Sequence, residues 1–162
     1  MSVPTVLSVD DSCDDAVLLR LACSTAKISF RLQSVQSGEE AIAYLEGRGK
    51  YADRVHFPLP DLILLDLKMP GKSGFDVLSW IRACPDLSRI PVLILTSSVH
   101  TKDRARALEL GAKQYLVKPV GYAALEALAE TVDRTLQQRA LEDTGFAGRQ
   151  YTSPSPNAPP MA

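Results

Sequence analysis

The sequence has few cysteines and no long apolar run, and these two shortages exclude whole classes of protein. Its 162 residues include three cysteines, an odd number, and no two of them stand in a C-x-x-C spacing. We therefore expect reduced thiols in a cytosolic protein and no disulfide framework. No apolar run approaches the roughly 20 residues that a membrane-spanning helix needs. The first ten residues also lack the basic region of a signal peptide.

The sequence also lacks an excess of charge of either sign. Lysine and arginine number 18, aspartate and glutamate number 19, and the formal net charge is −1. Such a chain has no global attraction to nucleic acid or to an anionic membrane surface. The hydrophobic content of 46% is enough to build one globular core. These properties predict a cytoplasmic protein with one domain and some length left over.

Strand-like and helix-like segments alternate five times along the chain. Helices are expected over residues 13–26, 37–46, 73–83, 102–110 and 122–141, and strands over residues 5–9, 30–35, 62–65, 90–95 and 114–117. This alternation predicts an α/β fold in which helices cover the two faces of a parallel sheet.

Two segments do not fit the alternation. Residues 48–60 are polar and end at a proline, which predicts a loop longer than most in compact domains. The end of the chain is rich in serine, proline, glycine and alanine, a composition that does not fold alone. We therefore expect a folded domain over residues 1–142 and a flexible tail over residues 143–162.

Asp66 directly follows four large aliphatic residues, Leu62–Leu65. An apolar run without alternation is typical of a parallel strand that is buried on both faces. The turn formers Pro70, Gly71 and Gly74 follow, so Asp66 is expected where this strand ends. Ligands of open α/β sheets bind at the carboxyl ends of strands. Asp66 is therefore either a capping residue or a group that takes part in chemistry.

Other predicted strands also end in polar residues that suit one kind of chemistry. The first ends in Asp10 and Asp11, the fourth in Thr96, and the fifth in Lys118. Parallel strand ends lie along one edge, where three carboxylates repel one another unless a cation neutralises them, and Mg²⁺ is the natural partner. Thr96 and Lys118 suit the oxygens of a phosphoryl group, and an aspartate can be its acceptor. Taken singly, each residue is more often a cap or a surface charge, but their conjunction favours a phosphoryl site.

This order of residues, D-D, D, T and K-P, resembles the receiver domain of two-component response regulators over residues from about 4 to 140. The resemblance implies a flavodoxin-like (βα)5 fold, a doubly wound parallel sheet with strand order 2-1-3-4-5. It also implies that Asp66 accepts a phosphoryl group from the phosphohistidine of a histidine kinase. The bond between Lys118 and Pro119 is usually cis in this family.

The resemblance implies a role for the other site residues as well. Asp11, Asp66 and the backbone carbonyl of Lys68 would bind Mg²⁺ directly, and Asp10 would bind it through water. Thr96 and Lys118 would hold the phosphoryl oxygens.

A switch comes with the resemblance. Phosphorylation would draw Thr96 inward and turn Tyr115 with it, which shifts the face formed by the fourth helix, the fifth strand and the fifth helix. Such regulators often form homodimers through this face.

The runs D-L-K-M-P-G-K-S-G and R-I-P-V-L-I-L-T-S-S look like those of the single-domain regulators paired with bacterial phytochromes. In that group the position of Lys68 is often asparagine. Lys68, together with Ser98, lies where the family tunes the access of hydrolytic water.

These observations predict a stand-alone response regulator in a phosphorelay. Its kinase would be a sensor histidine kinase of the bacteriophytochrome kind, and its output would be contact with a downstream protein. It would assist its own phosphorylation and dephosphorylation without being a conventional enzyme.

Three alternative functions are less consistent with the sequence. A pseudo-receiver that binds partners without phosphorylation usually loses an acid or the lysine, and this chain keeps them all. A P-loop ending at Gly71-Lys72-Ser73 needs a glycine where Asp66 stands. A phosphatase of the haloacid dehalogenase kind needs a second acid where Lys68 stands.

Overall fold

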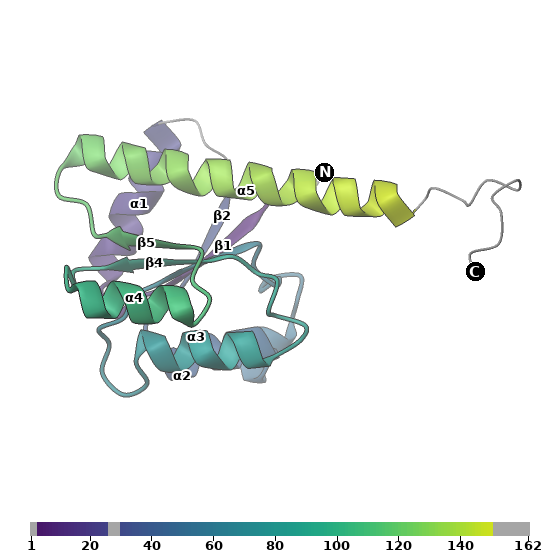
Figure 1. Cartoon of the computed structure of the whole chain (residues 1–162), viewed down its shortest axis with the longest axis horizontal. Coiled ribbons are helices and arrows are strands. Elements are labelled where there is room, and N and C mark those ends of the chain that lie inside the picture. Colours follow the sequence, from purple (N-terminus) through teal and green to yellow (C-terminus); the bar gives the residue numbers. More distant parts are fainter. Residues whose placement is uncertain (1–2, 26–29, 151–162) are drawn as a thin grey trace, which may run out of the picture.

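The computed structural model has a five-stranded parallel sheet between two layers of helices (Figure 1). It describes residues 3–25 and 30–150, and the side chains of those up to residue 143. The strands are β1 (Thr5–Val9), β2 (Arg31–Val35), β3 (Leu62–Leu65), β4 (Val92–Thr96) and β5 (Gln114–Val117). They pair in the order β2-β1-β3-β4-β5, which confirms the predicted flavodoxin-like topology.

One helix follows each strand. The helices are α1 (Cys13–Thr25), α2 (Gly38–Glu46), α3 (Gly74–Ala83), α4 (Thr101–Glu109) and α5 (Tyr122–Gln150). Helices α1 and α5 cover one face of the sheet, and α2, α3 and α4 cover the other (Figure 1). No helix among the described residues has the length and apolar character needed to cross a membrane.

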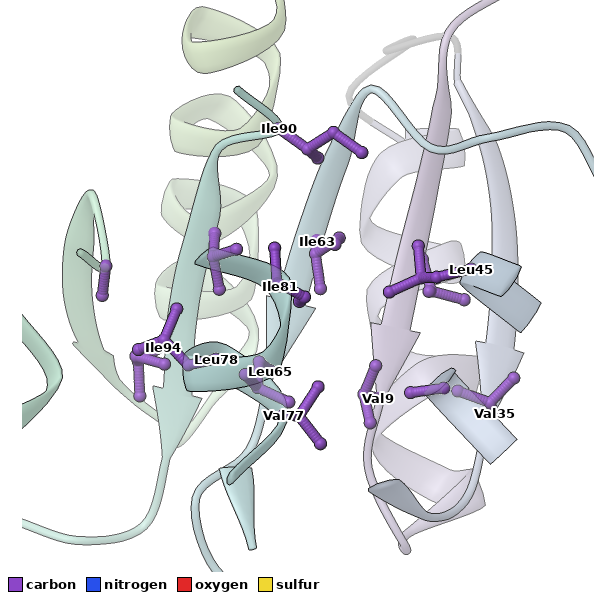
Figure 2. Close-up of a cluster of buried hydrophobic side chains, with 14 of the residues drawn as sticks. Val9, Val35, Leu45, Ile63, Leu65, Val77, Leu78, Ile81, Ile90 and Ile94 are labelled. Atoms are coloured by element: carbon purple, nitrogen blue, oxygen red, sulfur yellow. The ribbon is translucent and has the colours of Figure 1, made fainter. Parts of the chain in front are cut away.

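The central strand β3 contributes to two separate hydrophobic clusters, because successive side chains of a strand point to opposite faces. Ile63 and Leu65 pack beneath α3, in the cluster shown in Figure 2. Leu62 and Leu64 face α1 and α5 in the second cluster. All four side chains are buried, which confirms the strand buried on both faces that the unbroken apolar run predicts.

Serine residues begin two of the helices on the α2–α4 side. The Ser73 hydroxyl and the Asp76 carboxylate form a complete capping box at the start of α3. At α2 the Ser37 hydroxyl accepts a hydrogen bond from the Glu40 N–H at 3.1 Å. The Glu40 carboxylate accepts a hydrogen bond from the N–H of Gln36 instead of that of Ser37, so only half of a capping box forms at this helix.

Side chains hold the loop over residues 48–60 in place. It contains a short 3-10 helix, Gly49–Ala52, whose Tyr51 ring lies 5.0 Å from the rings of both Tyr44 and Phe57. The Arg54 guanidinium donates hydrogen bonds to the carbonyls of Tyr44, Leu45 and Phe57. These contacts attach the loop to α2.

The last helix is longer than the sequence predicts. Helix α5 ends at Gln150, beyond the expected end at residue 141, and its later turns extend past the sheet (Figure 1). The predicted tail thus begins inside this helix, while residues 151–162 lie outside the described residues. A domain boundary at residue 142 stays a prediction.

Candidate functional site

Three aspartates meet at the carboxyl edge of the sheet. Val9 of β1 pairs with Leu65 of β3, so the residues that follow, Asp10 and Asp66, lie side by side. The Asp66 N–H donates to the carbonyl of Val9 at 3.0 Å, which fixes this arrangement. Asp10 and Asp66 are buried and Asp11 is exposed, and one carboxylate oxygen of each lies within 4.8 Å of the others. The predicted acidic cluster therefore exists.

The Lys118 ammonium lies against these carboxylates. Its Nζ is 2.7 Å from Asp10 Oδ2, 3.1 Å from Asp66 Oδ2 and 2.9 Å from Asp15 Oδ2. Burial disfavours the charged ammonium, but the three carboxylates outweigh this effect and raise the pKa of Lys118 above its usual value. Burial raises the pKa of the Asp10 carboxyl, although Lys118 and the Ser12 N–H oppose the rise. Because its own pKa is raised, Lys118 stays charged and balances much of the negative charge of the cluster.

Asp15 is a fourth carboxylate that the sequence analysis missed. It lies in the first turn of α1, which starts two residues after Asp11, and its side chain is 38% exposed. Its position in the sequence could have predicted this contact, because side chains in the first turn of a helix point back toward the helix N-terminus, which here lies at the site.

Thr96 is the last residue of β4 and is fully buried. Its carbonyl accepts a hydrogen bond from the Lys118 N–H at 2.8 Å, and its Oγ1 lies 3.4 Å from the N–H of Ser98. The structure therefore places Thr96 on the same edge of the sheet as Asp66 and Lys118, between the strands that carry them.

A second polar network runs from Asp66 to β5. The Lys68 N–H donates to Asp66 Oδ1 at 3.2 Å, and the Lys68 Nζ lies 3.6 Å from Asp103 Oδ2 on α4. The Ser98 hydroxyl donates to the same Asp103 oxygen at 2.6 Å, and the Tyr115 hydroxyl donates to the Ser98 carbonyl at 2.9 Å. The hydrogen bond from Ser98 lowers the pKa of Asp103 most, and the positive charge of Lys68 lowers it further. Asp103 is the second carboxylate that the sequence analysis missed, and no motif or spacing pointed to it.

The peptide bond between Lys118 and Pro119 is trans, so the cis bond expected from the resemblance is wrong. The trans form is the intrinsically favoured one, by about 0.5–1 kcal/mol for a bond to proline.

Comparison with known proteins identifies the family. Residues 6–130 match the response regulator receiver domain. The chain belongs to this family.

This receiver is 40% identical to response regulator Rcp1 of Synechocystis sp. over 113 residues, which are 70% of this chain and 75% of that protein. The crystal structure of the phosphorylated cyanobacterial phytochrome response regulator RcpA superposes with a TM-score of 0.75 and 31% identity, covering 84% of this chain and 95% of that one. The crystal structure of the Mn²⁺-bound form of Rcp1 superposes with a TM-score of 0.71 and 36% identity, covering 80% of this chain and 91% of that one. The predicted likeness to phytochrome-associated regulators is thereby confirmed.

Proposed function

We propose that this receiver accepts a phosphoryl group on Asp66 from the phosphohistidine of a sensor histidine kinase in a two-component phosphorelay. The observation that carries the proposal is the buried Asp66 carboxylate with the Lys118 ammonium 3.1 Å away and two further aspartates beside it. As the new bond from Asp66 Oδ to phosphorus forms, the bond from the histidine nitrogen to phosphorus breaks. Lys118 and the Thr96 hydroxyl would hold the oxygens of the transferred group.

The same residues suit a divalent cation. Carboxylate oxygens are the ligands that Mg²⁺ prefers, and those of Asp10, Asp11 and Asp66 lie close enough together to hold one ion. The Lys68 backbone carbonyl would complete the protein ligands, as in related receivers. Bound there, Mg²⁺ would neutralise negative charge on the phosphoryl oxygens. The solved Mn²⁺-bound form of Rcp1 supports this assignment.

The response to phosphorylation would involve Thr96, Tyr115 and the surface formed by α4, β5 and α5. Tyr115 is half-buried and linked to the Thr96 side of the site through Ser98. Apolar side chains are exposed on this surface and suit protein contact, among them Leu108, Val117 and Tyr122. We infer that the surface controls binding of a downstream protein in the cytoplasm, and that two copies can pair through it. The kinase would be a bacteriophytochrome, and the receiver would assist its own phosphorylation and dephosphorylation without being a conventional enzyme.

Intact mass after incubation with acetyl phosphate tests the proposal. The wild type should gain one phosphoryl group only when Mg²⁺ is present, and Asp66→Asn should gain none while remaining folded. Asp86→Asn is a matched control, because it makes the same change at an exposed turn after α3. Labelling of Asp66→Asn at the wild-type rate would show that the acceptor is another residue. A folded wild type that gains nothing with Mg²⁺ present would favour a phosphorylation-independent pseudo-receiver.

A further inference from the structure

Asp103 in the first turn of α4 holds the Lys68 side chain beside the phosphoryl site. The Lys68 ammonium lies 3.6 Å from Asp103 Oδ2, while the backbone N–H of Lys68 is bonded to Asp66 Oδ1 at 3.2 Å. One residue therefore contacts the acceptor carboxylate through its backbone and α4 through its side chain. The Lys68 side chain is 64% exposed, so its flexible stem is free to move to a new partner.

We propose that Asp103 is a positioning residue that competes with a phosphoryl group on Asp66 for the Lys68 ammonium. The proposal rests on the proposed function of Asp66. Phosphorylated Asp66 would carry about 1.5 to 2 negative charges in place of the single charge of its free carboxylate, whereas Asp103 carries one. Phosphorylation would therefore draw the ammonium from α4 to the site, and the ion pair to Asp103 would be lost.

The loss matters because Asp103 also contacts the network that leads to Tyr115. The same Asp103 oxygen accepts the Ser98 hydroxyl at 2.6 Å, and Ser98 is buried. Ser98 in turn accepts the Tyr115 hydroxyl at its carbonyl, and its N–H faces Thr96 Oγ1. Without Lys68, the Asp103 carboxylate keeps the hydrogen bond from the Ser98 hydroxyl and lies in the first turn of α4, where a helix favours negative charge. The start of α4 would thus respond to the charge on Asp66 directly, in parallel with Thr96.

The size of the effect follows from the exposure of the pair. An exposed ion pair changes an equilibrium by about fivefold at most. Asp103 would therefore weaken the phosphorylated state by a factor of about two to five.

A double-mutant cycle with fluoroberyllate, an analogue of the phosphoryl group, tests the competition in the presence of Mg²⁺. Asp103→Asn keeps an oxygen acceptor for Ser98 but removes the charge, so fluoroberyllate should bind about two- to fivefold more tightly by calorimetry. In a Lys68→Met background the same substitution should not change the affinity, because the ammonium for which Asp103 competes is absent. Glu109→Gln is the matched control, an exposed acid at the other end of α4, and should change neither background.

A structural measurement complements the cycle. In Lys68→Met without ligand, the amide NMR signals of residues 101–103 should move toward their positions in fluoroberyllate-bound wild type. Unchanged affinity in Asp103→Asn, or an equal change in both backgrounds, would overturn the competition while leaving the function of Asp66 intact. A wild type that binds no fluoroberyllate with Mg²⁺ would instead refute the proposed function, and the inference with it.

Discussion

Replacement of Gly74 by alanine should damage the site through the backbone. Gly74 is the first residue of α3, and a Cβ atom there would lie 2.2 Å from the carbonyl oxygen of Asp66 and 2.8 Å from the Cα of Leu67. Real Cβ contacts are essentially never below 3.0 Å, so the start of α3 or the chain after Asp66 must shift by about 1 Å. Overpacking of this kind costs about 1–3 kcal/mol, and a rigid backbone neighbour places this case at the upper end. A 1 Å displacement of a reacting group lowers a rate by about 100-fold.

Two measurements check this expectation. Urea unfolding followed by the fluorescence of Trp80, on α3, should show a loss of about 3 kcal/mol in the free energy of unfolding. Phosphorylation of Asp66 by acetyl phosphate should slow by one to two orders of magnitude. Gly49→Ala is the matched control: Gly49 has a φ of 60° but no atom within 4 Å of an added Cβ, so it should lose about 1 kcal/mol and keep the normal rate. Wild-type stability and rate in Gly74→Ala would refute the reasoning from backbone contact.

Two further predictions concern charge. Lys118→Met removes an ammonium that contacts three carboxylates, so a Mg²⁺ titration should show at least about tenfold tighter binding; unchanged affinity would mean that Lys118 does not oppose the cation. Burial raises the pKa of the Cys23 thiol from 9.0 to about 11, so the unfolded state ionises first as the pH rises. The stabilisation is complete below pH 9 and is lost between about pH 9 and 11, at a cost of about 2–3 kcal/mol. Urea unfolding across this range should show a steeper loss in the wild type than in Cys23→Ala, because burial also raises the pKa of Tyr44 and Tyr51 in both proteins. Equal slopes would contradict the prediction.

The sequence predicts the sheet and the strand-end residues well, because these depend on local patterns. The strands Thr5–Val9, Leu62–Leu65 and Gln114–Val117 have the predicted bounds, since an apolar run ends each time at a turn former or a charge. The order of the strands came from the family resemblance, and the pairing confirms it.

What the sequence did not predict depends on long side chains and on the competition between local preferences. Asp15 and Asp103 join the site through Lys118 and Lys68, whose reach across the sheet edge depends on tertiary packing. The end of α5 was missed because a composition rich in serine, proline, glycine and alanine favours a flexible tail, and the preceding helix continues into this segment instead.

The burial of the strands has a consequence for how the receiver can respond. The four residues of β3, which Asp66 directly follows, are all buried, whereas the edge strand β5 has exposed or half-buried residues throughout. Amide hydrogens of β3 should therefore exchange with solvent only on global unfolding, and those of β5 through local opening at much lower free energy. In the proposed function, the acceptor Asp66 therefore follows a fully buried strand, whereas the responding surface includes a strand that opens readily. The surface could then rearrange while the acceptor keeps its geometry.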